Sequence, residues 1–325
     1  MKISIAMATY NGEKYIQEQL DSFLIQTRLP DELIISDDCS TDKTLEICQT
    51  FAKRAPFEVK ILKNTQNLGY AKNFENAMKN CGGNLIFLSD QDDVWFPEKI
   101  EKVLNIFSTN SAQLIVHDIE YCTQNLKPIG ETKLKRSYMA VGTKILHTGM
   151  ATALRSEFLK YCLPIPKNKY IAHDLWLSTC ADLLNKKYIL EEPLAYYRRH
   201  NNATSKDNMN YAKKTNKFYF FRLSLKNAFI NNIERNIIIN QEKINWLEDN
   251  KSKLITQSLL SENEYFYIKK KLLNNNEVNN QRLKIVSTKK RITRIIPALK
   301  LYIKGDYSYF NGIKSFIKDI FMKWT

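Results

Sequence analysis

The chain has 325 residues, 44% of them apolar, and a formal net charge of +15. This size suits one large α/β domain with an appendage, or two modest domains. No run approaches about 18 uncharged apolar residues, which argues against a membrane-spanning helix. The first residues enter a strand-like segment directly and lack the parts of a signal peptide. The six cysteines form no CxxC pair, and we expect thiols in a reducing compartment rather than a disulfide framework.

The charge is unevenly distributed along the chain. Residues 206–325 hold 24 Lys and Arg but only 10 Asp and Glu, a net of +14, which leaves +1 for residues 1–205. This asymmetry indicates two functional zones. We therefore predict a catalytic domain over residues 1–205, followed by a basic and mainly helical region over residues 206–325.

Apolar runs and helix-like segments alternate along the first zone. In chain order we expect a strand at 2–8, a helix at 13–26, a strand at 32–36, a helix that starts near 40–42, a strand at 58–62, a helix at 70–79, a strand at 85–88, and weaker strands at 113–116 and 188–190. Alternation of this kind predicts an α/β fold with a mostly parallel sheet flanked by helices.

Helical spacing replaces strand runs in the basic region. The asparagine-rich stretches at 274–276 and 279–280 are typical of loops. The last segment has the clearest helical pattern, with lysines off its apolar stripe. The stripe consists of Ile313, Phe316, Ile317, Ile320, Phe321 and Trp324.

Three carboxylates, Asp90, Asp92 and Asp93, follow the strand at 85–88 within four positions. Two unpaired carboxylates about 4 Å apart repel by roughly 4 kcal/mol at an effective dielectric near 20. A buried strand cannot tolerate three of them, so they must lie at its exposed carboxyl end, where a cation can gather them. Carboxylate oxygens suit Mg²⁺ or Mn²⁺, and a phosphate can supply the remaining ligands.

Other polar motifs also follow the predicted strands. The sequence places Thr9-Tyr10-Asn11 at the end of the first strand, Asp37-Asp38 after the second, and Asn67-x-Gly69 before the third helix, whose first turn contains Lys72. Because open α/β sheets hold ligands at the carboxyl ends of their strands, these residues should gather on one edge. An Asp there can accept the imide N–H of uracil or thymine, and helix N-termini with Lys72 can meet a diphosphate.

The order of these motifs resembles that of family-two glycosyltransferases, the inverting, nucleotide-sugar-dependent enzymes of the GT-A fold. The resemblance covers roughly residues 2–205. Its variant of the acid motif, together with the block around His173-Asp174, is similar to bacterial surface-polysaccharide transferases, many of them rhamnosyltransferases. The motifs are Thr9-Tyr10-Asn11, Asp37-Asp38-x-Ser40-Thr41-Asp42, Asn67-x-Gly69, Asp90-x-Asp92-Asp93, His173-Asp174-Leu175-Trp176 and Tyr197-Arg198-Arg199-His200-Asn201-Asn202.

The resemblance implies a role for each motif. The donor, a UDP- or dTDP-sugar, would be bound by Thr9, Tyr10, Asn11, Asp38, Asn67, Lys72, Asp90 and Arg199, with Asp38 on the base imide. A Mn²⁺ or Mg²⁺ ion would be held by Asp92, Asp93 and His200, although His200 could equally be a polar loop residue. Asp174 would be the general base, where the family often has Glu-Asp and this chain has His-Asp. The acceptor would meet Trp95, His173 and Trp176.

Several alternatives remain open from the residues alone. The acid cluster also fits the nucleophile loop of haloacid-dehalogenase-like phosphatases, with Asp90 as nucleophile, and a non-catalytic nucleotide-sugar-binding protein is a further alternative. The basic region could dock on the catalytic domain or on a second subunit as a homodimer, bind an anionic membrane surface that carries a lipid-linked glycan acceptor, or bind nucleic acid, which we do not expect. We expect a cytoplasmic protein, peripheral at the inner face of the cell membrane.

Overall fold

The structure is a computed structural model that describes residues 1–200 and 230–321. The chain divides into two compact units. The first comprises Met1–Lys167 and Ile171–Lys217, and the second comprises Asn168–Tyr170 and Phe218–Thr325. The change from one unit to the other along the chain falls outside the described residues, so the predicted boundary between residues 205 and 206 stays a prediction.

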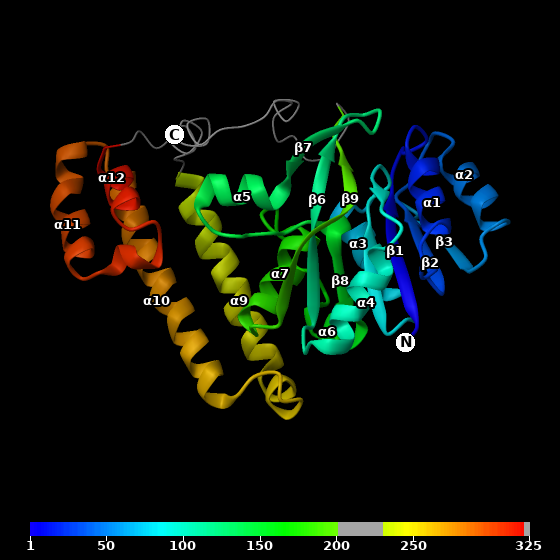
Figure 1. Cartoon of the computed structure of the whole chain (residues 1–325). Helices are drawn as coiled ribbons and strands as arrows, with labels where there is room; N and C mark the ends of the chain where they lie inside the picture. The colour runs from blue at the N-terminus through cyan, green and yellow to red at the C-terminus, as the bar shows by residue number, and fades with distance from the viewer. Residues whose placement is uncertain (201–229, 322–325) are drawn as a thin grey trace. The chain divides into compact units, whose positions relative to one another are not determined.

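A mixed sheet is the centre of the first unit (Figure 1). Its strands run in the order β3-β2-β1-β4-β8-β6-β9-β5, and β7 pairs with β6. The bounds are β1 Ile3–Thr9, β2 Glu32–Asp37, β3 Glu58–Lys63, β4 Leu85–Ser89, β5 Val94–Trp95, β6 Leu114–Cys122, β7 Pro128–Thr132, β8 Thr152–Arg155 and β9 Lys187–Arg198.

The parallel part of the sheet is formed by β1 to β4, as the alternation of elements predicts. Beyond β4 the sheet is mixed: β8 is antiparallel to both β4 and β6, whereas β9 is parallel to β6. The α/β class is therefore confirmed. The predicted parallel arrangement holds for β1 to β4 but not for the rest of the sheet. The two weak strand signals belong to β6 and β9, which are much longer than their apolar cores.

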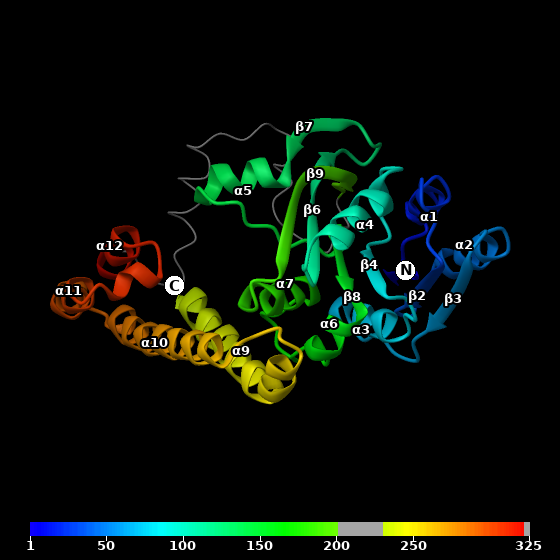
Figure 2. The same cartoon turned by 60° about the horizontal axis from the view of Figure 1, so that its bottom comes forward.

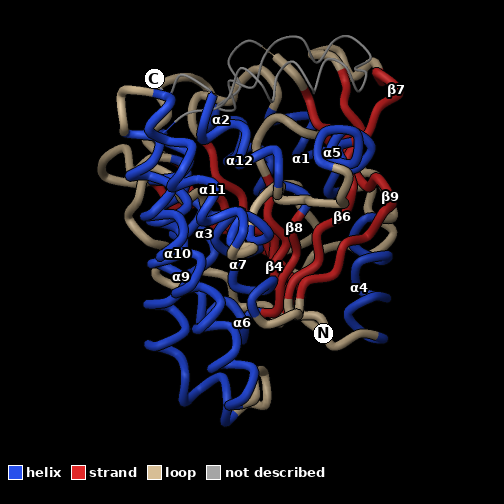
Figure 3. Tube along the Cα trace, turned by 90° about the vertical axis from the view of Figure 1, so that its left-hand side faces the viewer, coloured by secondary structure: helices blue, strands red, loops and turns tan. Residues whose placement is uncertain are grey.

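Helices cover both faces of this sheet. Figures 2 and 3 show α3, α6 and α7 on one face and α4 on the other. The bounds are α1 Ile16–Leu24, α2 Thr44–Ala52, α3 Tyr70–Lys79, α4 Lys99–Thr109, α5 Lys133–Val141, α6 Ser156–Cys162 and α7 His173–Leu183, with the 3₁₀ turn η1 at Gly149–Ala151. Strands β1, β2 and β4 are buried along their whole length, apart from one half-buried position in β1.

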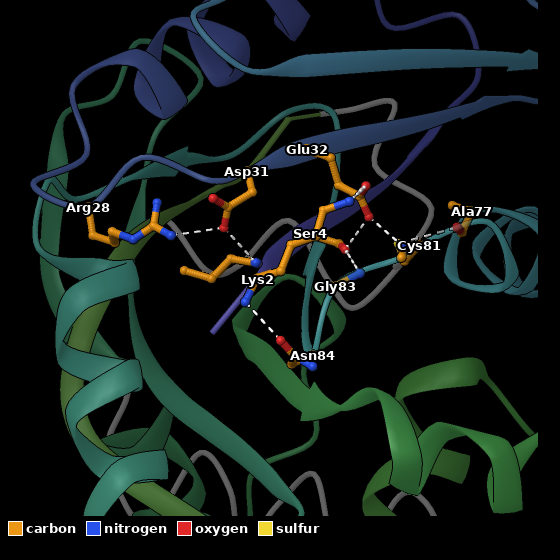
Figure 4. Close-up of polar contacts among 11 residues, drawn as sticks. Lys2, Ser4, Arg28, Asp31, Glu32, Ala77, Cys81, Gly83 and Asn84 are labelled. Atoms are coloured by element: carbon orange, nitrogen blue, oxygen red, sulfur yellow. Dashed lines mark hydrogen bonds and ion pairs between the residues drawn. The ribbon is translucent and has the colours of Figure 1, made fainter.

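A hydrogen-bonded cluster fixes the amino ends of the parallel strands, at the edge opposite the predicted site (Figure 4). The buried carboxylate of Glu32 accepts from the Lys2 ammonium at 2.6 Å and from the Ser4 hydroxyl at 2.5 Å. Burial alone would raise the pKa of Glu32, but the bonds from Lys2, Ser4 and the Gly82 N–H lower it below its ordinary value. This cluster therefore holds β1 to β2 as an ionised, satisfied pair.

The second unit is helical within the described residues (Figure 1). Two long helices, α9 (Ile230–Thr256) and α10 (Glu262–Ser287), pack against each other. Ser261 and Glu264 form a capping box that starts α10. After α10 the chain forms η3 (Arg291–Arg294), α11 (Ile295–Ile303), η4 (Asp306–Tyr309) and α12 (Ile313–Phe321).

The end of this unit has a small core of its own. Ile285, Ala298, Leu301, Tyr307 and Ile320 are buried together. The buried carboxylate of Asp319 accepts two bonds from the Arg282 guanidinium, at 2.7 and 3.1 Å, and one from the Tyr307 hydroxyl at 2.8 Å. A buried ion pair satisfied in this way links α10 to α12.

Three predictions for this region meet different outcomes. The predicted loops at 274–276 and 279–280 are wrong, since both stretches lie inside α10. Tertiary packing outweighs the weak helix propensity of asparagine there, because Asn276 and Asn279 are buried. The last helix is confirmed as α12, although Trp324 lies outside the described residues. Within those residues, no helix is both long and apolar enough to span a membrane.

Candidate active site

The carboxyl ends of the parallel strands meet at one edge of the sheet. The strand register places Thr9 opposite Asp37 and Asp37 opposite Lys63, while Met7 pairs with Ser89. The loops that follow β1, β2, β3 and β4 therefore leave the sheet side by side. These loops carry the motifs at Thr9, Asp37, Asn67 and Asp90.

Asp38 organises the loop that precedes α3. Its carboxylate accepts from the backbone N–H groups of Leu68 and Gly69 at 2.8 and 2.9 Å, and from the Asn64 amide at 2.9 Å. The Asn67 amide donates in turn to the Asp38 carbonyl at 3.2 Å. With 2% of its surface exposed, Asp38 is above all a loop anchor, and its contact with a nucleobase stays a prediction.

Asn11 and Asp37 join the loops after β1 and β2. Asn11 has φ 47° and accepts from the Thr41 N–H at 2.8 Å, while its own N–H donates to the Ser40 hydroxyl. The buried Asp37 carboxylate accepts from the hydroxyl of Thr9 at 2.9 Å and from Ser40. Thr9 therefore bonds directly to Asp37, and Asn11 is linked to Asp37 through Ser40, so the two loops are fixed to each other.

Gln91 connects the acid loop to the loop after β1. Its amide accepts from the Tyr10 N–H at 2.8 Å and donates to the Tyr10 carbonyl at 2.9 Å. A Cβ at Gly12 would stand 2.4 Å from the Gln91 oxygen, so a larger residue at position 12 would displace this clamp. Tyr10 is half exposed beside it, a location that suits the predicted contact with a nucleobase.

Asp90 is influenced by the neighbouring acids. Burial, followed by the charges of Asp92 and Asp174, raises the pKa of Asp90 to about 7. Asp174 lies at the start of α7, far along the chain, yet its charge acts on Asp90. A carboxyl whose pKa is raised by neighbouring carboxylates indicates a site where a cation or a donated proton is required.

Asp93 and Arg198 form the base of this cluster. The Asp93 carboxyl is completely buried. One of its oxygens accepts from the backbone N–H of Arg198 at 3.0 Å, while the other has no hydrogen-bond partner among the described residues. The Arg198 guanidinium donates to the carbonyls of Asp92 at 2.7 Å and Gln124 at 2.6 Å, and it pairs with Glu18. Burial, then the charges of Asp92 and Asp90, raises the pKa of Asp93 well above its ordinary value.

Asp92 and His200 lie together and would offer two ligand atoms to a metal ion. His200 Nε2 lies 2.7 Å from Asp92 Oδ2, and the imidazole packs 4.6 Å from the Tyr15 ring, centroid to centroid. Carboxylate oxygen with imidazole nitrogen suits Mn²⁺ better than Mg²⁺, which prefers oxygen alone. Among residues 1–200 and 230–321, no three His, Cys, Asp or Glu side chains form a metal centre unaided. A donor diphosphate would have to complete the coordination.

Lys99 is a fully buried lysine on the core side of the acids. Its ammonium donates to the Met150 carbonyl at 2.6 Å and lies 3.4 Å from the centre of the Trp95 ring. Burial lowers the pKa of Lys99 well below its ordinary value, whereas the charges of Asp93 and Asp90 act in the opposite direction. Lys99 therefore supports the cluster from the core side and touches no solvent.

The predicted acceptor residues are mostly covered. Trp95 is a core side chain that packs edge-on against Phe23 at 4.8 Å between ring centroids. Trp176 is also buried, and its indole N–H donates to the Cys162 carbonyl at 2.8 Å. In this structure neither tryptophan offers a face to an acceptor, because strand β5 and helix α7 direct both inward. Sequence alone does not distinguish a pocket tryptophan from a core one.

The remaining predicted site residues, His173, Lys72 and Arg199, each make different contacts. His173 stacks on Phe74 at 4.0 Å, and both of its buried ring nitrogens are without a hydrogen-bond partner. The Lys72 ammonium is bound to Glu75 at 2.5 Å and to the Ile165 carbonyl at 2.9 Å, so a diphosphate would have to compete with both. Arg199 is half-buried over the Tyr197 ring. Asn201 and Asn202 lie outside the described residues.

Three supporting residues escaped the sequence prediction. The motif that contains Arg198 predicts no role for it. Gln91 lies between two acids, and Lys99 lies in a helix without any motif. Only Arg198 lies in a sequence pattern that could have predicted its burial, because an arginine at the end of a long strand with alternating side chains can point inward. The other two depend on contacts between distant segments.

Comparisons with known proteins place the first unit in one family. The profile described as glycosyl transferase family 2 matches residues 4–162. The dTDP-rhamnosyl transferase RfbG of Shigella flexneri is 32% identical over 224 residues, which cover 64% of this chain and 76% of the relative. A glycosyltransferase of Nostoc sp., named as uncharacterized, is 31% identical over 212 residues, and that match spans 62% of this chain and 65% of the Nostoc protein.

A solved structure shares the fold. S. aureus TarS 1–349, crystallised with UDP-GlcNAc, superposes with a TM-score of 0.58 at 20% identity, over 98% of this chain and 82% of that one. At this identity the likeness concerns the fold alone. The fold and the family implied by the motifs are thus confirmed, whereas the individual site residues stay predictions.

Replacing Arg198 tests the base of the site. Arg198→Met should lower the free energy of unfolding by about 2–4 kcal/mol, because the Asp92 and Gln124 carbonyls lose the buried guanidinium that donates to them, whereas the backbone N–H bond to Asp93 is kept. Glu18→Gln is the matched control. Glu18 is half exposed, so its loss should cost less than about 1 kcal/mol. Urea unfolding measures both, and equal costs would show that the exposed pair is the important contact.

The titration of Asp90 gives a second prediction, for protein in chelator without metal. The pKa of Asp90 is raised in the folded state, so between about pH 4 and pH 7 the folded protein holds a proton on Asp90 that the unfolded protein has lost. The contribution of Asp90 to the free energy of unfolding therefore falls as the pH rises through this range. Asp90→Asn should therefore raise the Tm above wild type at pH 8.5, by less at pH 5. The exposed Asp249→Asn should show no such pH dependence. A lower Tm for Asp90→Asn at pH 8.5 would contradict the account.

Proposed function

The chain belongs to glycosyltransferase family 2, and we propose that it is a metal-dependent inverting enzyme that moves a hexose or deoxyhexose from a UDP- or dTDP-sugar to a bacterial cell-surface glycan. The observation that carries the proposal is the convergence of Asp174 on Asp90 at the carboxyl edge of the parallel strands. The relative from Shigella, named as a dTDP-rhamnosyl transferase, and TarS, crystallised with UDP-GlcNAc, support this donor class.

Each group would have one chemical task. Tyr10 would lie along the base, and the loops anchored by Asp38 would hold the nucleotide. Asp92 and His200 would hold Mn²⁺, which would neutralise the diphosphate as it leaves. Asp174 would accept the proton of the acceptor hydroxyl, which attacks the anomeric carbon from the face opposite the diphosphate. One displacement inverts the anomeric configuration, and no covalent sugar–enzyme intermediate is needed.

We further propose that the acceptor is lipid-linked and that the protein works at the inner face of the cell membrane. The support is the net charge of +14 over residues 206–325, since basic segments are attracted to anionic lipid. A homodimer stays a prediction. The phosphatase alternative conflicts with family membership, and the complete acid cluster with Asp174 argues against the binding-protein alternative. An assay separates both from the proposal.

The assay is donor turnover with Mn²⁺ or with chelator. Nucleoside diphosphate should appear only with metal. Free phosphate would indicate the phosphatase, and no product with any donor would indicate a binding protein. Asp92→Asn should abolish turnover, because it removes the charge beside His200.

Asp174→Asn should leave donor binding intact and lower the transfer rate by at least about 100-fold, the scale of general-base catalysis. Donor binding is measured by thermal shift with Mn²⁺. The exposed Asp249→Asn controls for charge loss. Normal transfer by Asp174→Asn would move the base elsewhere, while normal turnover by Asp92→Asn would remove the metal assignment.

A further inference from the structure

Helix α11 carries an apolar face that points to solvent. Ile295, Ile296, Leu299, Tyr302 and Ile303 are all exposed, and Ile296 and Ile303 are 68% and 76% exposed. At 3.6 residues per turn these five positions fall within roughly 120° of arc. The buried residues Ala298 and Leu301 lie on the other side of the helix. A water-facing helix normally has the opposite pattern.

The surroundings of this face are strongly basic. Between Glu277 and Asp306 the chain contains no acidic residue but eight Lys and Arg. Two of these, Arg282 and Arg294, are buried in internal contacts. The remaining six are exposed: Lys284, Lys289, Lys290, Arg291, Lys300 and Lys304. Exposed apolar side chains bordered by cations and free of acids match an anionic bilayer surface, where the apolar residues enter the lipid and the cations meet phosphates.

A pocket of about 650 Å³ adjoins the face, between α10, η3 and α11. Lys284, Lys300 and Lys304 line it together with Thr288 and Thr293, and its remaining lining includes apolar side chains such as Ile285, Leu301 and Ile303. A mostly apolar pocket lined by three lysine side chains suits an amphipathic anion, whose phosphate would meet the lysines and whose glycerol or chain carbons would lie against the apolar wall. Ile303 belongs to both the pocket and the exposed face, so the two are continuous.

We propose that the outward face of α11 and the adjoining lysine pocket dock on an anionic phospholipid bilayer, with lipid phosphate headgroups entering the pocket. A second copy of this chain is the competing occupant of an apolar face. The charge argues against it, because two copies would bring their basic borders together without an acid between residues 278 and 305. This assignment deepens the proposed membrane-face location, and it rests on that part of the proposed function.

Vesicle sedimentation tests the proposal without donor, acceptor or metal, so its failure is distinguishable from a failure of the transfer reaction. The full chain should bind vesicles of equal parts phosphatidylglycerol and phosphatidylcholine, and bind pure phosphatidylcholine at least about tenfold more weakly. Lys284→Glu/Lys300→Glu/Lys304→Glu should weaken binding by about 100-fold or more, since each lysine near an anionic surface contributes about a factor of five. Ile296→Ser/Ile303→Ser should weaken binding at least about tenfold by removing the apolar contact.

Matched variants control for charge and for apolar area. Lys53→Glu/Lys270→Glu/Lys271→Glu makes the same charge change at exposed lysines outside the pocket, and Ile25→Ser/Ile145→Ser removes exposed isoleucines of the first unit. Both should bind within about threefold of wild type. All substitutions are on the surface, and unchanged circular dichroism and Tm verify folding. Equal binding to both vesicle types, equal loss in the control variants, or a dimer in light scattering that only Ile296→Ser/Ile303→Ser dissolves would each overturn the proposal.

Discussion

The site depends on holding like charges together at the end of a buried strand. Asp90, Asp92 and Asp93 follow β4, and Asp174 joins them from the start of α7, although their mutual repulsion favours dispersal. Two buried basic side chains oppose this repulsion: Arg198 bonds to the backbone of the acid loop, and Lys99 acts on Asp90 and Asp93 from the core side. In the proposed mechanism, the charge that remains would bind a divalent ion, which in turn would bind the donor diphosphate.

The loops around the acids are ordered by bonds between side chains and backbone. Asp38 anchors the loop before α3, Asn11 joins the first two loops, and Gln91 clamps Tyr10. Parallel strands make this possible, since every loop leaves from the same edge. The opposite edge is closed by the Lys2–Glu32 pair. One edge of the sheet is thus closed by internal bonds, and the other is the edge at which α/β enzymes generally bind their ligands.

Much of this arrangement could be predicted from the sequence, for physical reasons. The strands β1 to β4 and the helix α3 are local patterns of apolar spacing, and the motifs after each strand follow from the parallel topology. Lys99, Gln91 and the inward direction of Trp95 and Trp176 could not be predicted, because burial depends on contacts between segments distant in sequence. The loops predicted for the asparagine-rich part of α10 were wrong for a similar reason, since packing against neighbouring helices outweighs the low helix propensity of asparagine.

The central claim is that the gathered carboxylates bind a divalent ion together with a nucleoside diphosphate. Calorimetric titration of Mn²⁺ with UDP or dTDP, in buffers of different ionisation enthalpy, tests it directly. Because burial and neighbouring acids raise the pKa of Asp90 to about 7, binding should release protons at pH 6.5, and fewer at pH 8.5. Binding that is independent of metal, or that releases no proton at pH 6.5, would contradict the account.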